Sequence, residues 1–214
     1  MTRQEIKAWA KEKIKNGNMW GVLGVVIVAN LISGITASIE TKSGLVNITV
    51  SVGTDILTFI LGVGLVNYMV NFITDQPKNF DLLFSKFKYW KNLIKAWFIY
   101  FANVFLWTLL LIVPGIIKSY AYSLVPYILN DNPEMNSKEA LDLSEKMMDG
   151  HKGELFVLQL SFIGWELLGI LTLGILYLWL VPYMQTAQTK FLYEVKTNYE
   201  KANNISLKTE EVVA

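Results

Sequence analysis

The segment "LLLIVPGIIKSYAYSLVPYILNDNP" (residues 109–133) joins two apolar stretches without a polar loop between them. Residues 94–129, taken as one helix, would be about 54 Å long, far more than a bilayer core of about 30 Å. Pro114 and Gly115 mark a break or a tight turn inside this length. We therefore expect two transmembrane helices that meet at these two residues. The alternative is one proline-kinked helix with an interfacial end.

The composition is that of an integral membrane protein, because 53% of the residues are hydrophobic and only 17% are charged. Six apolar segments predict transmembrane helices. Their approximate bounds are 20–39, 56–73, 94–112, 116–130, 155–171 and 174–192. We expect one integral membrane domain over residues 1–195. The polar residues 196–214 predict a disordered cytoplasmic tail.

The distribution of basic residues predicts the topology. With six spans, every Lys and Arg except Lys42 and Lys118 falls on one side of the membrane. The positive-inside rule places that side, and with it both termini, in the cytoplasm. A five-span chain would put the basic loop at 138–152 outside, against the rule. The cysteine-free, lysine- and asparagine-rich sequence favours the cytoplasmic membrane of a bacterium, crossed several times.

A short motif recurs in the even-numbered spans, as "LVNYM" (65–69), "LVPYI" (124–128) and "LVPYM" (180–184). Because these three spans run in the same direction, the recurrence predicts tandem units related by an axis along the membrane normal. Chance is the alternative in a chain this rich in Leu, Val and Tyr. The candidate kink and repeat residues are Pro114, Pro126, Tyr127, Pro182 and Tyr183.

Each pair of spans follows a segment with an amphipathic pattern, near residues 6–14, 80–87 and 136–150. Asn136 and Glu139 form a possible capping box at the start of the third segment. The predicted fold is an all-α, polytopic membrane helix bundle. Its six transmembrane helices form three tandem hairpins, each preceded by an interfacial amphipathic helix.

Three ionisable residues lie in or beside the predicted spans: Lys118, Glu166 and Asp55. A charge inside a membrane needs a partner or water, so an ion pair of Lys118 with Glu166 or with Asp55 is one interpretation. In the alternative, Lys118 extends to the outer interface and Glu166 lies among the headgroups beside Trp165. The glycine pair in "LGVGL" (61–65) predicts close helix packing.

The sequence carries no recognised constellation for catalysis. It has no cysteine and one histidine, and it lacks the phosphate-binding, dinucleotide-binding and hydrolase motifs. We therefore expect no enzyme activity, no cofactor and no metal site. The basic amphipathic segments predict contact with the anionic lipids of the inner leaflet and give no indication of nucleic-acid binding.

Most of the chain resembles a bacterial family of integral membrane proteins called domain of unknown function 975. The resemblance is carried mainly by Pro114-Gly115-Ile116, Tyr127-Ile128-Leu129, Asp131-Asn132-Pro133, Gly150-His151-Lys152, Ser161-Phe162-Ile163-Gly164-Trp165 and Pro182-Tyr183. It implies a polytopic membrane protein without an established activity or cofactor. The chain is also distantly similar to the membrane portion attached to some glycerophosphodiester phosphodiesterases, whose catalytic domain it lacks.

Two functional hypotheses follow. The first is a non-enzymatic, accessory membrane protein that binds lipids or a partner membrane protein, which includes a second copy of itself. The second is a small transporter or permease subunit for a lipid or another amphiphile. The transporter hypothesis predicts that Lys118, Glu166 and the prolines of the repeated motif face a common cavity.

Overall fold

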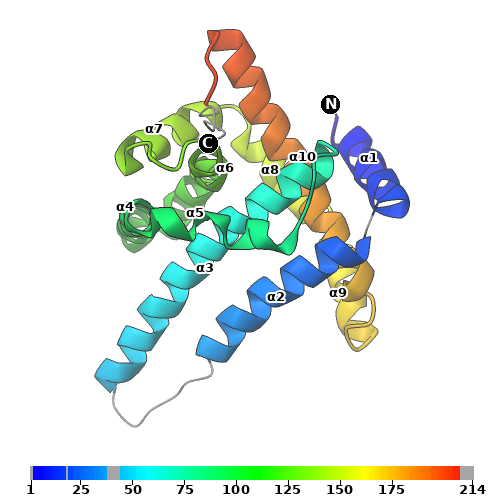
Figure 1. Ribbon diagram of the computed structural model, residues 1–214, viewed down its shortest axis with the longest axis horizontal. Helices are drawn as coiled ribbons and strands as arrows, with labels where there is room; N and C mark the ends of the chain where they lie inside the picture. Colours follow the sequence, from blue (N-terminus) through cyan, green and yellow to red (C-terminus); the bar gives the residue numbers. More distant parts are fainter. Residues whose placement is uncertain (1, 18, 38–43, 208–214) are drawn as a thin grey trace.

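The computed structural model describes residues 2–17, 19–37 and 44–207, with the side chains of 29–30 and 32–48 left out of the description. The predicted span end at 38–39, Lys42 and the tail residues 208–214 lie outside it. Every regular element in the described chain is a helix, which confirms the all-α prediction (Figure 1). The helices are α1 (Arg3–Asn16), α2 (Met19–Ala37), α3 (Gly44–Ile73), η1 (Phe80–Leu83), η2 (Ser85–Tyr89), α4 (Trp90–Leu110), α5 (Ile112–Ala121), α6 (Val125–Asp131), α7 (Ser137–Met147), α8 (Lys152–Leu160), α9 (Ile163–Leu171) and α10 (Tyr177–Asn203).

Four helical segments are long and apolar enough to cross a membrane, and they correspond to the predicted second, third, fourth and fifth spans. Their bounds are Thr49–Ile73, Phe80–Leu110, Ile112–Asp131 and Lys152–Leu171. The first predicted span falls in α2, whose described apolar part is Met19–Val28. The sixth span is not among the four, because polar residues follow Met184 in the middle of α10. The count of six spans stays a prediction.

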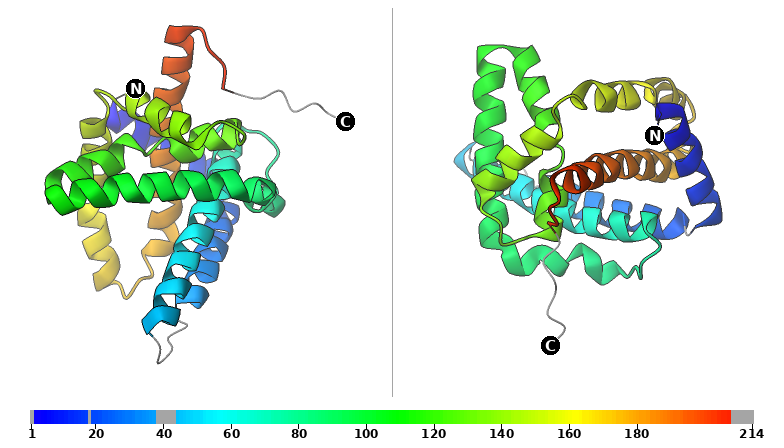
Figure 2. Two further views of the ribbon diagram at one scale, coloured as in Figure 1. Left: turned by 90° about the vertical axis from the view of Figure 1, so that its left-hand side faces the viewer. Right: turned by 90° about the horizontal axis from the view of Figure 1, so that it is seen from above.

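The helical hairpins share a core but do not all point the same way. Helices α2 and α3, and the turn between α9 and α10, extend toward one end of the molecule (Figure 1). Helix α1 and the C-terminal end of α10 lie at the opposite end, and the side of the membrane on which the termini lie stays a prediction. Helix α4 instead runs crosswise to α3 (Figure 2). Three parallel tandem hairpins therefore also stay a prediction.

The break between α4 and α5 separates the predicted third and fourth spans, but it lies earlier than expected. The chain turns at Leu111, whose backbone is extended with φ −158° and ψ 136°. Pro114 and Gly115 fall in the first turn of α5, where a proline gives up no intrahelical hydrogen bond. A Cβ atom on Gly115 would lie 2.0 Å from Thr108 Oγ1. Glycine is therefore needed for α5 to lie directly against α4.

Two of the three predicted amphipathic helices are confirmed. Helix α1 begins with a capping box between Thr2 and Glu5, and its buried face packs on α10. Helix α7 begins at the N-cap Asn136, whose side chain accepts a hydrogen bond from the Lys138 N–H. Its predicted apolar face is buried, because Ala140, Leu141, Ser144, Met147 and Met148 all lie in the interior. Both helices therefore form where their apolar patterns predict, but Asn136 caps α7 through the Lys138 N–H and not through the predicted capping box with Glu139.

The amphipathic helix predicted near residues 80–87 is wrong. This segment forms two short 3₁₀ helices, η1 and η2, and Leu83 is buried while Phe80 and Phe84 are exposed. The physical reason is a close backbone contact with α3. A Cβ atom on Gly64 would lie 1.9 Å from the Leu83 carbonyl oxygen. This contact shows close packing at Gly64, whereas a Cβ atom on Gly62, the other glycine of the pair, would meet no atom within 4 Å. The close approach at Gly64 leaves no room for a regular helix that packs sideways on α3.

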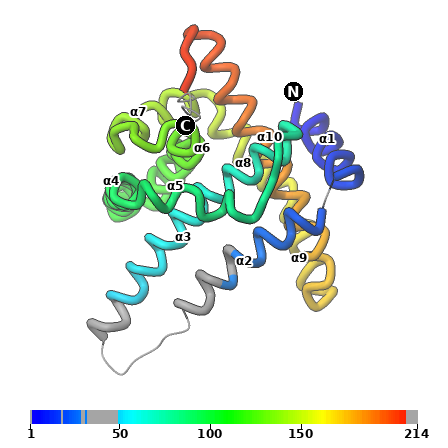
Figure 3. Tube along the Cα trace, in the orientation of Figure 1, coloured from blue at the N-terminus to red at the C-terminus, as the bar shows by residue number. Residues whose placement is uncertain are grey.

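The predicted domain boundary at residue 195 is also corrected. Helix α10 continues to Asn203, so residues 196–203 are helical (Figure 3). The side chain of Lys196 is buried against the end of α6. The ion pair of Lys196 with Asp131 holds this region to the rest of the molecule, although its polar sequence predicted a disordered tail.

Candidate functional site

Strongly exposed apolar side chains lie at the ends of two hairpins. Around the α4–α5 turn, five consecutive residues are between 65% and 73% exposed. Leu173, at the α9–α10 turn, is 94% exposed. The apolar ends are defined as Leu109, Leu110, Leu111, Ile112 and Val113 at α4–α5, with Leu171, Leu173 and Ile175 at α9–α10. Patches of this kind mark contact with a membrane or with a partner.

The backbone of both apolar ends is hydrogen-bonded within the turn itself. At α4–α5, the Leu111 N–H donates to the Trp107 carbonyl. At α9–α10, the N–H of Gly174 donates to the Gly169 carbonyl, and the N–H of Leu176 donates to the Thr172 hydroxyl. Peptide groups in hydrocarbon must find partners within the protein, because no water is present to bind them. The N–H groups of the α9–α10 turn meet that requirement.

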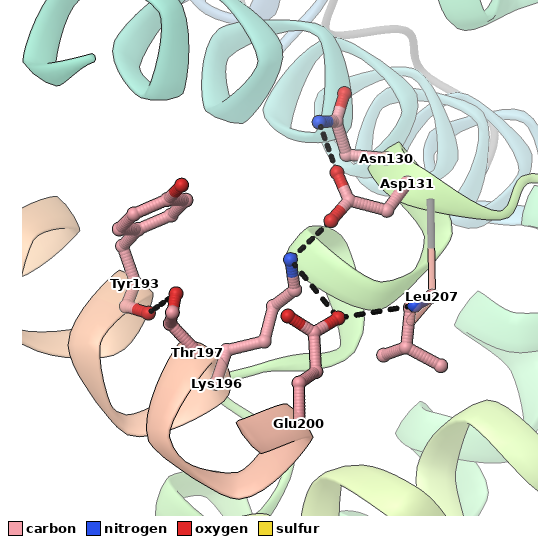
Figure 4. A network of polar contacts seen from close by, with 7 residues as sticks. All are labelled: Asn130, Asp131, Tyr193, Lys196, Thr197, Glu200 and Leu207. Carbon is pink, nitrogen blue, oxygen red and sulfur yellow. Dashed lines mark hydrogen bonds and ion pairs between the residues drawn. The ribbon is translucent and has the colours of Figure 1, made fainter. Parts of the chain in front are cut away.

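A charged cluster lies at the opposite end of the bundle, where α6 meets α10 (Figure 4). The Lys196 ammonium group lies between Asp131 and Glu200, and its Nζ is 3.6 Å from Glu200 Oε1. Asp131 forms the closer ion pair with Lys196, and it also accepts a hydrogen bond from the Asn130 amide. The side chains of Lys196 and Asp131 are each only 6% exposed. Their pairing is therefore required to offset the loss of hydration.

Reasoning from the sequence missed this cluster, because residues 196–203 are polar. A signal was nevertheless present. Phe191, Val195 and Tyr199 recur at intervals of four, which is the spacing of one helix face, and this face continues beyond residue 195. The Glu200 carboxylate also accepts a hydrogen bond from the Leu207 N–H, so the cluster holds the chain that follows α10.

Lys118 is paired, but with a different partner from either of the predicted ones. Its Nζ lies 2.6 Å from Glu145 Oε1 of α7. Glu166 is half-buried and Asp55 is exposed, and neither carboxylate contacts Lys118 in the described structure. The interpretation that pairs Lys118 with Glu166 or Asp55 is corrected, because the crosswise α4–α5 hairpin carries Lys118 toward α7.

The tyrosines of the repeated motif gather in the core. Tyr68, Tyr127 and Tyr183 are all buried, on α3, α6 and α10. The Tyr127 hydroxyl donates a hydrogen bond to Thr189 Oγ1, and the Tyr183 ring packs edge-on against Phe162. These contacts assign the tyrosines a packing role; the tandem repeat itself stays a prediction.

The prolines of the motif have different positions. Pro126 lies in the first turn of α6 and leaves no unpaired carbonyl inside a helix. Pro182 lies inside α10, where the Thr186 hydroxyl donates to its carbonyl. Only Pro182 therefore interrupts a helix as predicted, because without an N–H it gives no hydrogen bond to the carbonyl of Leu178, four residues earlier.

Lys7 of α1 reaches the break between α8 and α9. Its ammonium group lies 3.2 Å from Ser161 Oγ and 4.5 Å from the centre of the Phe162 ring. Burial, and next the charge of Arg3, lower the pKa of the Lys7 ammonium group. Two cations thus lie near one another at the N-terminal end of α1.

Comparison with known proteins identifies the family of this chain. The family model described as "Protein of unknown function (DUF975)" matches residues 88–199, from η2 through most of α10. The chain belongs to the DUF975 family. The DUF975 match contains Asp131 and Lys196 of the charged cluster and ends one residue before Glu200. No curated protein and no solved structure matches the chain. Similarity to the phosphodiesterase membrane portion stays a prediction.

Proposed function

We propose that this DUF975 protein is a non-enzymatic membrane protein that binds lipid directly, with its apolar ends inserted in the hydrocarbon of the bacterial cytoplasmic membrane. The observation that carries the proposal is the pair of apolar turns. Their side chains are exposed, and the turn at α9–α10 pairs its own N–H groups. Water-exposed loops rarely consist of Leu, Ile and Val alone, whereas lipid-exposed ones require such side chains.

The proposed orientation places the charged cluster and both termini in the cytoplasm. Helices α1 and α7 are amphipathic, and each has basic residues in its last turn, Lys13 and Lys15 in α1 and Lys146 in α7. Their apolar faces are buried in the protein, so it is the basic residues of the two helices that are proposed to contact the anionic lipids. The apolar ends of α4–α5 and α9–α10 then enter the same membrane by different routes, the first crosswise and the second end-on.

The six-span topology, with three tandem hairpins, is a distinct proposal about the same surface. It places the α4–α5 and α9–α10 turns at the outer face of the membrane, and it requires α4–α5 to align with α2 and α3. The close contact of Lys118 with Glu145 favours insertion without a full crossing by α4–α5. Glu145 lies on amphipathic α7, which is predicted to be cytoplasmic.

Lipid binding is proposed ahead of transport. A transporter was expected to turn Lys118, Glu166 and the prolines of the repeated motif toward a common cavity. Lys118 is instead bound to Glu145, and Pro126 and Pro182 lie on separate helices packed into the core. Neither the pocket on α7 nor the pocket between α1 and α8 contains any of these residues.

The test is purification of the tagged full-length chain from its native membrane in mild detergent. Bound phospholipid is then quantified, and protein partners are identified by mass spectrometry. The proposal predicts retained phospholipid that survives detergent exchange, and no stoichiometric protein partner. A stoichiometric membrane-protein partner and no retained lipid would contradict it and support an accessory subunit.

A further inference from the structure

A pocket of about 500 Å³ lies where the N-terminal turn of α1 meets α8 and α10. Its apolar wall consists of Ile6, Leu158 and Phe191, all buried. Its polar lining includes Arg3 and Glu154. Pockets of this size hold small-molecule ligands, and an apolar wall with a few polar groups fixes the ligand's orientation. The lining therefore suits an amphiphile.

The apolar wall continues onto the surface proposed to contact lipid. Val157 lines the pocket and is itself exposed. Leu160 and Ile163, at the end of α8 and the start of α9, are exposed apolar residues further along the chain. An acyl chain that leaves the pocket therefore has an apolar surface to follow.

The charges of the pocket are of both signs. Arg3 supplies a guanidinium group, whose geometry suits phosphate oxygens. Its charge acts on Lys7 as well, so an anion bound here would relieve repulsion between two cations. Glu154 supplies a carboxylate, which lies 2.8 Å from His151 Nδ1. A ligand with one anionic and one cationic group matches this lining best.

We propose that the pocket binds the headgroup of a phospholipid that carries a phosphate and a primary ammonium group, such as phosphatidylethanolamine. The proposal rests on the proposed lipid-binding function and names the lipid class. Arg3 binds the phosphate, and Glu154 accepts hydrogen bonds from the ammonium group. The wall of Ile6, Leu158 and Phe191 packs against the first part of the acyl chains.

Other phospholipids fit the lining less well. The quaternary ammonium of phosphatidylcholine has no N–H to donate to Glu154, whereas a primary ammonium has three. Phosphatidylglycerol has no cation, so Glu154 would face an anionic lipid. Free phosphoethanolamine has the charges but leaves the apolar wall uncovered. The pocket thus predicts an order of affinity in which phosphatidylethanolamine is first.

The experiment uses the delipidated full-length protein in detergent, with each lipid added in turn and bound lipid counted by native mass spectrometry. We expect phosphatidylethanolamine to bind about tenfold more tightly than phosphatidylcholine or phosphatidylglycerol, the effect of one charge-assisted hydrogen bond. Glu154→Gln should remove this preference, and Arg3→Gln should weaken the binding of all three lipids by the same factor. Glu139→Gln, an exposed acidic position on α7, is the matched control and should change nothing.

A second variant keeps the charges and fills the space. Val157→Trp changes an exposed position, so folding should persist, and binding of phosphatidylethanolamine should fall. Equal affinities for the three lipids, or a preference that survives Glu154→Gln, would overturn the assignment. Phosphoethanolamine that binds as tightly as the lipid would overturn it too. If lipid is retained without headgroup preference, this inference fails alone; if no lipid is retained, the proposed function fails with it.

Discussion

The ammonium group of Lys118 lies 2.6 Å from a carboxylate oxygen of Glu145 and joins α5 to α7. The two residues are 27 positions apart in the chain. The contact shows that the turn between α4 and α5 brings Lys118 back over the amphipathic helix α7. This ion pair therefore links the crosswise α4–α5 hairpin to α7.

We predict that Lys118 and Glu145 are energetically coupled. The side chains are 22% and 39% exposed, so a coupling energy of about 0.5–1 kcal/mol is expected, as for partly solvated pairs. A double-mutant cycle of Lys118→Met and Glu145→Gln, measured by chemical unfolding in mixed micelles, gives this value. Lys118→Met combined with Glu166→Gln is the control and should be additive. Coupling to Glu166 in place of Glu145 would contradict the structure.

The two glycines of "LGVGL" should respond oppositely to the same substitution. Gly64→Ala places a methyl group 1.9 Å from the Leu83 carbonyl oxygen and should destabilise the protein by at least about 2 kcal/mol. Gly62→Ala meets no atom within 4 Å and should be neutral or stabilising by up to about 1 kcal/mol. Thermal unfolding of both variants in detergent tests the pair. Equal effects would mean that η1 does not pack on Gly64.

We predict that replacing Lys196 alone lowers the free energy of unfolding more than replacing Lys196 and Asp131 together. Lys196→Met leaves the buried Asp131 without its main partner, so a loss of about 3–5 kcal/mol is expected. Adding Asp131→Asn to the same chain should recover much of this loss. Lys190→Met is the matched control on α10, since the pair of Lys190 with Glu194 is more exposed. A Lys196→Met variant as stable as the control would place residues 196–203 outside the folded domain.

One surface contact predicts a dependence on acid. The Lys13 ammonium group donates a hydrogen bond of 2.6 Å to Asp75, which lowers the pKa of that carboxyl group. The folded pKa is below the unfolded one, so the contribution is full above the unfolded pKa of about 3.9. It is lost as the pH falls through the folded pKa.

Asp75→Asn should therefore lower the melting temperature near neutral pH, and the difference from the native chain should vanish in acid. Asparagine is suited to the left-handed backbone of this residue, φ 58°, so the substitution isolates the charge. The measurement is thermal unfolding in detergent across the acidic range. A difference that grows toward low pH would contradict the assignment.

Local patterns in the sequence predicted the elements whose structure depends on nearby residues. The faces of α1 and α7 follow from residues three and four apart, and the start of α7 follows from the cap residue Asn136. The break before Pro114 follows from the length limit on one span. Each of these features is decided within a few turns of helix.

The features that the sequence did not predict depend on contacts between distant residues. The partner of Lys118 is set by how α4–α5 lies against α7, which no local spacing encodes. The η1 segment is set by Gly64, about twenty residues earlier in the chain. Lys196 appeared to belong to a solvated tail, because its partner Asp131 is contributed by another helix.

The most direct test of the central claim is the depth of the apolar turns in a bilayer. The chain has no cysteine, so Leu173→Cys, Leu110→Cys and Asp142→Cys each carry one fluorescent probe in reconstituted vesicles. Lipid-binding insertion predicts that quenchers on the acyl chains quench the probes at positions 173 and 110, and that aqueous iodide quenches only the probe at 142. If iodide quenches the probe at 173, and impermeant maleimide labels that cysteine in intact cells, the turn lies in water and the account is wrong.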